Sequence, residues 1–103
     1  MLFVLIRQEG AGWDRARPLR EQAGWDEHAA YIDALAEEGF VRLGGLLGDG
    51  EPVHRAMLII EADSEATVHA RTEQDPWTPT HTLETVSVEP WEVLVGEVPA
   101  PAP

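Results

Sequence analysis

The segment that most constrains the fold is the first one, Met1–Arg7, which reads MLFVLIR. In an extended strand, alternate side chains point to opposite faces of the sheet. One face would carry Leu2, Val4 and Ile6, and the other would carry Phe3 and Leu5. Because both sets are apolar, we predict a central strand in a sheet that is covered on both sides.

The rest of the chain reads as two helices and three further strands. They follow an irregular loop at 8–23, which has room for one helical turn. We predict a helix at Gly24–Glu38, strands at Phe40–Leu47 and Val53–Glu61, a helix from Asp63 or Ser64 to about Gln74, and a last strand at Thr82–Val95. Gly39 is typical of the left-handed residue that ends a helix. Pro90 predicts a bulge or an edge position for the last strand.

This β-α-β-β-α-β order favours an α+β, ferredoxin-like fold, with an antiparallel four-stranded sheet and both helices on one face. The first and third strands are central in that topology, and these two segments are apolar on both faces. Arg42 and Glu84 would then lie on edge strands. Nothing in the chain would cover the second face of the sheet. We therefore predict a homodimer in which two copies pack sheet to sheet.

Composition excludes several classes of function. With 103 residues the chain is one domain, and it contains no cysteine and no lysine. Disulfides, thiol nucleophiles, Schiff-base lysines and P-loops are therefore excluded. Seven arginines stand against nineteen acidic residues, a net charge of −12, which disfavours binding to nucleic acid.

The two ends of the sequence indicate a compartment. The apolar N-terminus is too short for a signal peptide, and no run approaches the roughly 18 apolar residues of a membrane span. We predict a cytoplasmic protein that binds no membrane. The folded domain is predicted to cover residues 1–96, and the Pro- and Ala-rich residues 97–103 are predicted to be a disordered tail.

His28 is the strongest candidate for acid–base chemistry. It lies within the apolar stripe of the first helix, which consists of Trp25, Ala29, Ile32, Leu35 and Ala36. A buried imidazole near a helix N-terminus favours its neutral form, which can act as a general base. The alternative is that His28 is a buried core residue whose polar atoms are hydrogen-bonded and that it has no catalytic role. The other histidines, His54, His69 and His81, lack the spacing of a metal site and are interpreted as surface or half-buried residues.

Asp75 is the candidate for the group that orients such a base. A carboxylate at the C-terminal end of a helix opposes the helix dipole. Residues that break a local rule in this way are candidates for function. The alternative is that Asp75 only shapes the turn with Pro76.

Tryptophans and glycines near these residues could form a binding pocket. Trp25, Trp77 and Trp91 each lie close to the end of a helix or strand, where they could wall an aromatic pocket. They could equally fill the core or a dimer interface. Gly44 and Gly45 could admit close approach to the backbone beside a pocket.

Three arginines in the loop form a separate cluster. Arg15, Arg17 and Arg20 could attract an anionic substrate to an otherwise acidic protein. The alternative is a solvated loop in which they pair with Asp14 and Glu21.

Taken together, these motifs resemble the YciI-like (YCII-related) family. The resemblance covers roughly Met1 to Gly96 and rests on Trp25-Asp26-Glu27-His28, the glycine after that helix, Gly44-Gly45, Asp75-Pro76-Trp77 and Pro90-Trp91. It implies a dimeric α/β-barrel built from two ferredoxin-like subunits. It also implies an active site that pairs a histidine of the first helix with the aspartate of the DP(F/W) turn. Those positions are His28 and Asp75 in this chain.

The resemblance also suggests relatives that act on small cyclic or aromatic compounds by isomerisation or elimination. We therefore predict a small enzyme that needs no cofactor or metal, with His28 as the base and Asp75 fixing its tautomer. Trp25, Trp77, Gly44, Gly45 and Arg20 would bind the substrate. Two alternatives are a non-catalytic module that binds a small ligand in the same pocket, and an accessory protein whose acidic surface meets a basic partner.

Overall fold

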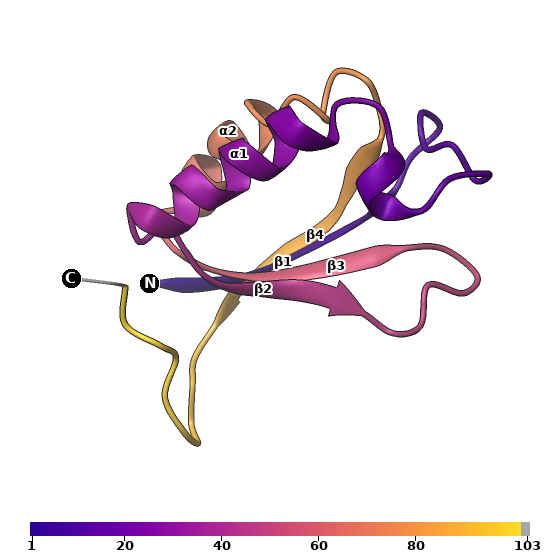
Figure 1. Ribbon diagram of the computed structural model, residues 1–103. Helices are drawn as coiled ribbons and strands as arrows, with labels where there is room; N and C mark the ends of the chain where they lie inside the picture. The colour runs from indigo at the N-terminus through magenta and orange to yellow at the C-terminus, as the bar shows by residue number, and fades with distance from the viewer. Residues whose placement is uncertain (102–103) are drawn as a thin grey trace.

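The computed structural model describes residues 1–101 (Figure 1). Its elements are β1 (Leu2–Glu9), the 3-10 helix η1 (Leu19–Glu21), α1 (Trp25–Glu37), β2 (Val41–Leu47), β3 (Arg55–Glu61), α2 (Glu65–Glu73) and β4 (Leu83–Trp91). The strands form one antiparallel sheet in the order β2-β3-β1-β4. The predicted α+β, ferredoxin-like fold is confirmed, with β1 and β3 in the centre and β2 and β4 at the edges.

Both helices cover the same face of the sheet (Figure 1). Phe3 and Leu5 of β1 point toward them and are each 2% exposed. They join one core cluster with Leu35 of α1 and Val68 of α2. On the opposite face, the Leu2, Val4 and Ile6 side chains remain only partly buried, so this chain covers one face of its own sheet.

Local backbone signals set the bounds of both helices. Gly24 and Gly39 have positive φ angles of 80° and 84° and flank α1, which confirms the predicted stop at Gly39. The α2 helix begins after Ser64, whose hydroxyl oxygen accepts a hydrogen bond from the Thr67 N–H at 3.2 Å. Ala36, predicted to be buried in the α1 stripe, is exposed, because a cavity separates this part of α1 from β2.

The last strand is shorter than predicted and ends at Trp91 instead of Val95. Pro90 does not interrupt it, since Pro90 pairs with Phe3 and an edge strand tolerates a missing N–H donor. The irregularity lies elsewhere: between Ile6 and Arg7 the register shifts, and β4 carries one extra residue. The third strand likewise begins at residue 55 instead of 53.

The loop before α1 packs against the turn before β4. The Gly12 N–H donates to the His81 carbonyl oxygen at 2.9 Å. A Cβ atom at Gly12 would lie 2.0 Å from the Thr80 carbonyl oxygen, so only glycine fits there. Trp13 is 7% exposed and belongs to a second apolar cluster that includes Trp77.

After β4 the chain turns back on the side of the sheet opposite the helices (Figure 1). Residues 92–101 form no helix or strand, and the Arg42 Nη1 atom donates to the Pro99 carbonyl oxygen at 3.5 Å. Residues 102–103 lie outside the described part of the chain, and disorder of the tail at 97–103 stays a prediction. Over residues 1–101, neither helix is long and apolar enough to cross a membrane.

Candidate functional site

A cavity of about 390 Å³ lies between α1 and the β2 side of the sheet. Its walls include Trp25, His28 and Ile32 from α1, Trp13 from the loop, and Gly44 and Gly45 from β2. A volume of this order suits a small ligand, because small-molecule sites are mostly apolar clefts of roughly 300–1,000 Å³ with a few convergent polar groups.

His28 and Asp75 meet at this cavity. The Nδ1 atom of His28 lies 2.9 Å from Oδ1 and 2.8 Å from Oδ2 of Asp75. The side chain of His28 is 12% exposed and that of Asp75 is 1% exposed. The two helices are in contact, since the Tyr31 hydroxyl of α1 donates to the Arg71 carbonyl oxygen of α2 at 2.7 Å, and they run in opposite directions (Figure 1). The first turn of α1, which carries His28, and Asp75, two residues after the end of α2, therefore lie at the same end of the helix layer.

Arg7, which sequence reasoning missed, contacts Asp75. Its Nη1 atom donates to Oδ2 of Asp75 at 2.7 Å, and Arg7 is 3% exposed. A signal was available: in the alternation of β1, Arg7 falls on the same face as Phe3 and Leu5. A charge at the end of that buried row needs a buried partner of opposite charge.

Several partners act on the Asp75 carboxyl. Burial raises its pKa, but hydrogen bonds with His28 and the Trp77 amide, and the charges of His28 and Arg7, outweigh burial and hold the pKa below its ordinary value. Asp75 is therefore ionised at neutral pH and can only accept hydrogen bonds. It follows that Nδ1 of His28 carries the proton in this contact, which leaves Nε2 as the nitrogen that can accept one.

Trp77 lies behind His28 instead of on the cavity wall. The two rings stack with centroids 4.0 Å apart and an interplanar angle of 8°. The indole Nε1 of Trp77 donates to the Ala23 carbonyl oxygen at 2.8 Å, and the residue is 1% exposed. Trp77 thus fixes the plane of the imidazole, whereas Trp25 lines the cavity itself.

Two other predicted binding residues lie away from the cavity. The Arg20 guanidinium sits 5.7 Å from the centroid of the Trp25 ring, and its side chain is exposed. Trp91 pairs with Leu2 and so lies on the opposite face of the sheet, where it is 42% exposed. The other loop arginines form surface pairs: Arg15 with Glu9, and Arg17 with Asp14.

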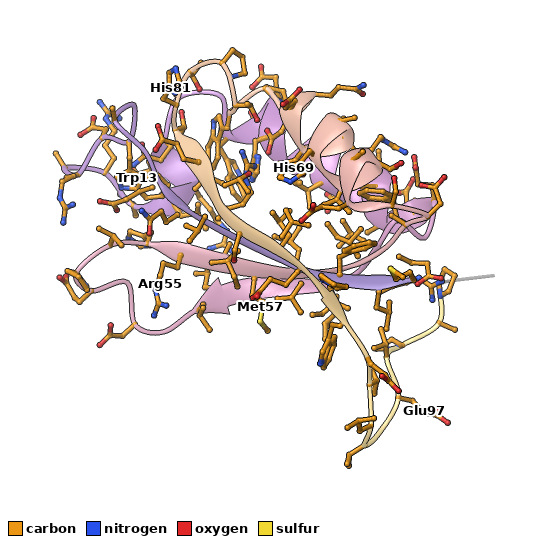
Figure 2. All side chains as sticks on the ribbon, turned by 180° about the vertical axis from the view of Figure 1, so that it is seen from behind. Trp13, Arg55, Met57, His69, His81 and Glu97 are labelled. Atoms are coloured by element: carbon orange, nitrogen blue, oxygen red, sulfur yellow. The ribbon has the colours of Figure 1, made fainter. Side chains whose placement is uncertain are left out.

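A second histidine, His54, also lines the cavity. It is half-buried, and its ring centroid lies 4.8 Å from that of Trp13. Figure 2 shows Trp13 on the helix side of the sheet. His69 and His81 are exposed. Within residues 1–101, no three His, Asp or Glu side chains come close enough together to hold a metal ion.

These features define a class of protein: a ferredoxin-like domain with a histidine–aspartate pair in a small-molecule cavity. The chain belongs to the YCII-related domain family, whose sequence model matches residues 1–92. This finding confirms the resemblance seen in the sequence.

Among solved structures, the chain is similar to 5-chloro-2-hydroxyhydroquinone dehydrochlorinase (TftG) from Burkholderia phenoliruptrix AC1100, in a complex with 2,5-dihydroxybenzoquinone. The two sequences are 31% identical and the TM-score is 0.60; the match covers 89% of this chain and 94% of the other. A search among curated proteins found no match.

Proposed function

We propose that the protein is a small enzyme that removes a proton from a hydroxylated cyclic or aromatic compound and thereby drives an elimination or an isomerisation. The observation that carries the proposal is the contact between His28 and a buried, ionised Asp75 at the wall of the cavity. Similarity to a dehydrochlorinase that was solved with a dihydroxybenzoquinone supports the substrate class.

In the proposed reaction, Nε2 of His28 takes the proton of a ring hydroxyl. The O–H electron pair becomes a C=O bond, and the displaced ring electrons take up a proton, returned by the His28 imidazolium, at another ring carbon, which gives the keto isomer. Where that carbon carries chlorine, loss of a proton from a second ring hydroxyl then forms a second C=O bond, moves a ring double bond onto that carbon and expels chloride. For a chlorinated ring the products are a quinone-type compound and HCl in overall balance. Asp75 stabilises the imidazolium that forms, as a carboxylate does beside a catalytic histidine.

The test compares two histidine variants on one substrate. We expect the protein to release chloride from 5-chloro-2-hydroxyhydroquinone, measured without oxygen to prevent oxidation of the ring. His28→Asn should lower turnover at least about 100-fold, because general base catalysis contributes roughly 10² to 10⁴ in rate. His69→Asn is the matched control, since His69 is exposed on α2, and should retain full turnover.

Two results would overturn the proposal. Turnover that persists in His28→Asn would remove His28 as the base. Tight binding of 2,5-dihydroxybenzoquinone by a parent protein that turns over no member of a panel of hydroxylated aromatics would instead identify a binding module.

We also propose that two copies pair through the sheet face that carries no helices. On that face Ile6 pairs with Met57, and Leu2 pairs with Trp91. Figure 2 shows Met57 pointing away from the helices. Met57, Leu43 and Trp91 are 38%, 54% and 42% exposed. A second copy with the same face would bury this apolar surface symmetrically.

A further inference from the structure

The ion pair between Arg7 and Asp75 is the most deeply buried charged contact of the described chain. Besides its contact with Asp75, Arg7 uses Nη2 to donate to Thr78 Oγ1 at 3.2 Å and to the Leu83 carbonyl oxygen at 3.4 Å. Its backbone belongs to β1, a central strand bonded on both sides. The guanidinium is therefore held in one place against the carboxylate.

The charged groups around His28 indicate how the contact between Arg7 and Asp75 affects the protonation of the imidazole. Asp75 is contacted by His28 from α1, by Arg7 from β1 and by the Trp77 amide of its own turn. The imidazole itself faces this carboxylate and the rings of Trp77 and Trp25. A buried carboxylate with His28 as its only charged partner would favour the imidazolium, because an uncompensated buried charge is costly. An imidazolium cannot accept a proton.

We propose that Arg7 is a positioning residue that keeps His28 in its neutral, proton-accepting form by balancing the charge of Asp75. This inference rests on the proposed role of His28 as a base. With neutral His28, the three side chains sum to zero charge. After His28 has taken a proton, they carry one positive charge. That charge would then stabilise the phenolate or enolate formed from the substrate in the same cavity.

The experiment is an NMR titration of the His28 ring in Arg7→Gln, which keeps a polar side chain and removes the charge. We expect the midpoint of the titration to move up by about one pH unit relative to the parent, the lower end of the effect of a neighbouring charge. Arg17→Gln is the matched control, because Arg17 is exposed and, among the described residues, forms its ion pair with Asp14, and should leave the midpoint within about 0.2 pH unit. An unchanged or lowered midpoint in Arg7→Gln would overturn the proposal.

A second measurement covers the case in which Arg7→Gln does not fold. The ¹⁵N shifts of the parent protein at pH 7.5 should show a neutral His28 with the proton on Nδ1, and Arg7→Lys, which retains the charge, should show the same state. An imidazolium in the parent at that pH would contradict the proposal. Neither readout needs a substrate. Absence of turnover with the expected titration shift would therefore refute the proposed function alone, whereas turnover without the shift would refute only the role of Arg7.

Discussion

At the residue scale, the buried Asp75 carboxylate accepts hydrogen bonds from three partners: Arg7, His28 and the Trp77 amide. We expect Asp75→Asn to lower the free energy of unfolding by about 3 kcal/mol, because Arg7 would be left buried without its counter-charge. Urea unfolding followed by tryptophan fluorescence measures this. Asp33→Asn makes the same change at an exposed position of α1 and should stay within about 0.5 kcal/mol of the parent. Equal losses of unfolding free energy in the two variants would contradict a stabilising role for the buried contact between Asp75 and Arg7.

The pH dependence of stability follows from the same carboxylate. Its folded-state pKa lies below the ordinary value, so its contribution to stability is fully present above the unfolded pKa of about 3.9. That contribution is lost as the pH falls through the folded pKa. We therefore expect the free energy of unfolding of the parent to fall more steeply with acid below about pH 5 than that of Asp75→Asn. Urea unfolding at each pH measures both proteins. If the free energy of unfolding fell equally with acid in the two, Asp75 would not contribute to the pH dependence of stability.

At the scale of elements, the long loop depends on a contact that admits no side chain. We expect Gly12→Ala to cost about 2 kcal/mol in unfolding free energy, since the added methyl group would meet the Thr80 carbonyl oxygen. Under the proposed function, the change should also weaken substrate binding, because the loop carries Trp13 to the cavity.

The matched control is Gly45→Ala. No atom of residues 1–101 lies within 4 Å of a Cβ placed at Gly45, so the free energy of unfolding of Gly45→Ala should stay within about 0.5 kcal/mol of the parent. Urea unfolding compares the two variants. A loop that is not anchored to the 80–81 turn would make Gly12→Ala as harmless as Gly45→Ala.

At the scale of the whole molecule, the uncovered sheet face predicts the oligomeric state. We expect sedimentation at micromolar concentration to show a dimer for the parent and a monomer for Met57→Glu, because a carboxylate cannot be buried unpaired in an apolar interface. Ala70→Glu adds the same charge at an exposed position of α2 and should remain dimeric. A monomeric parent would refute the pairing of sheets.

Much of the fold could be predicted from local signals. The alternation of apolar residues in β1 placed it in the centre of the sheet, and Gly39 marked the end of α1. These patterns are local, because periodicity and backbone preference depend on neighbours along the chain. The sequence pattern predicts too long a β4, because apolar residues continue after Trp91, whereas pairing with β1 stops at Leu2.

The site was predictable only in part. Sequence alone determined that acid–base chemistry, if present, falls to histidine and carboxylate, and it singled out His28 and Asp75. Only the tertiary structure decided that Arg7, 68 residues before Asp75, shares its carboxylate. The tertiary structure also decided that Trp77 lies behind the imidazole while Arg20 lies outside the cavity. Such contacts depend on the register of the strands and on the distance between α1 and the sheet. Neither is determined by the sequence of a single segment.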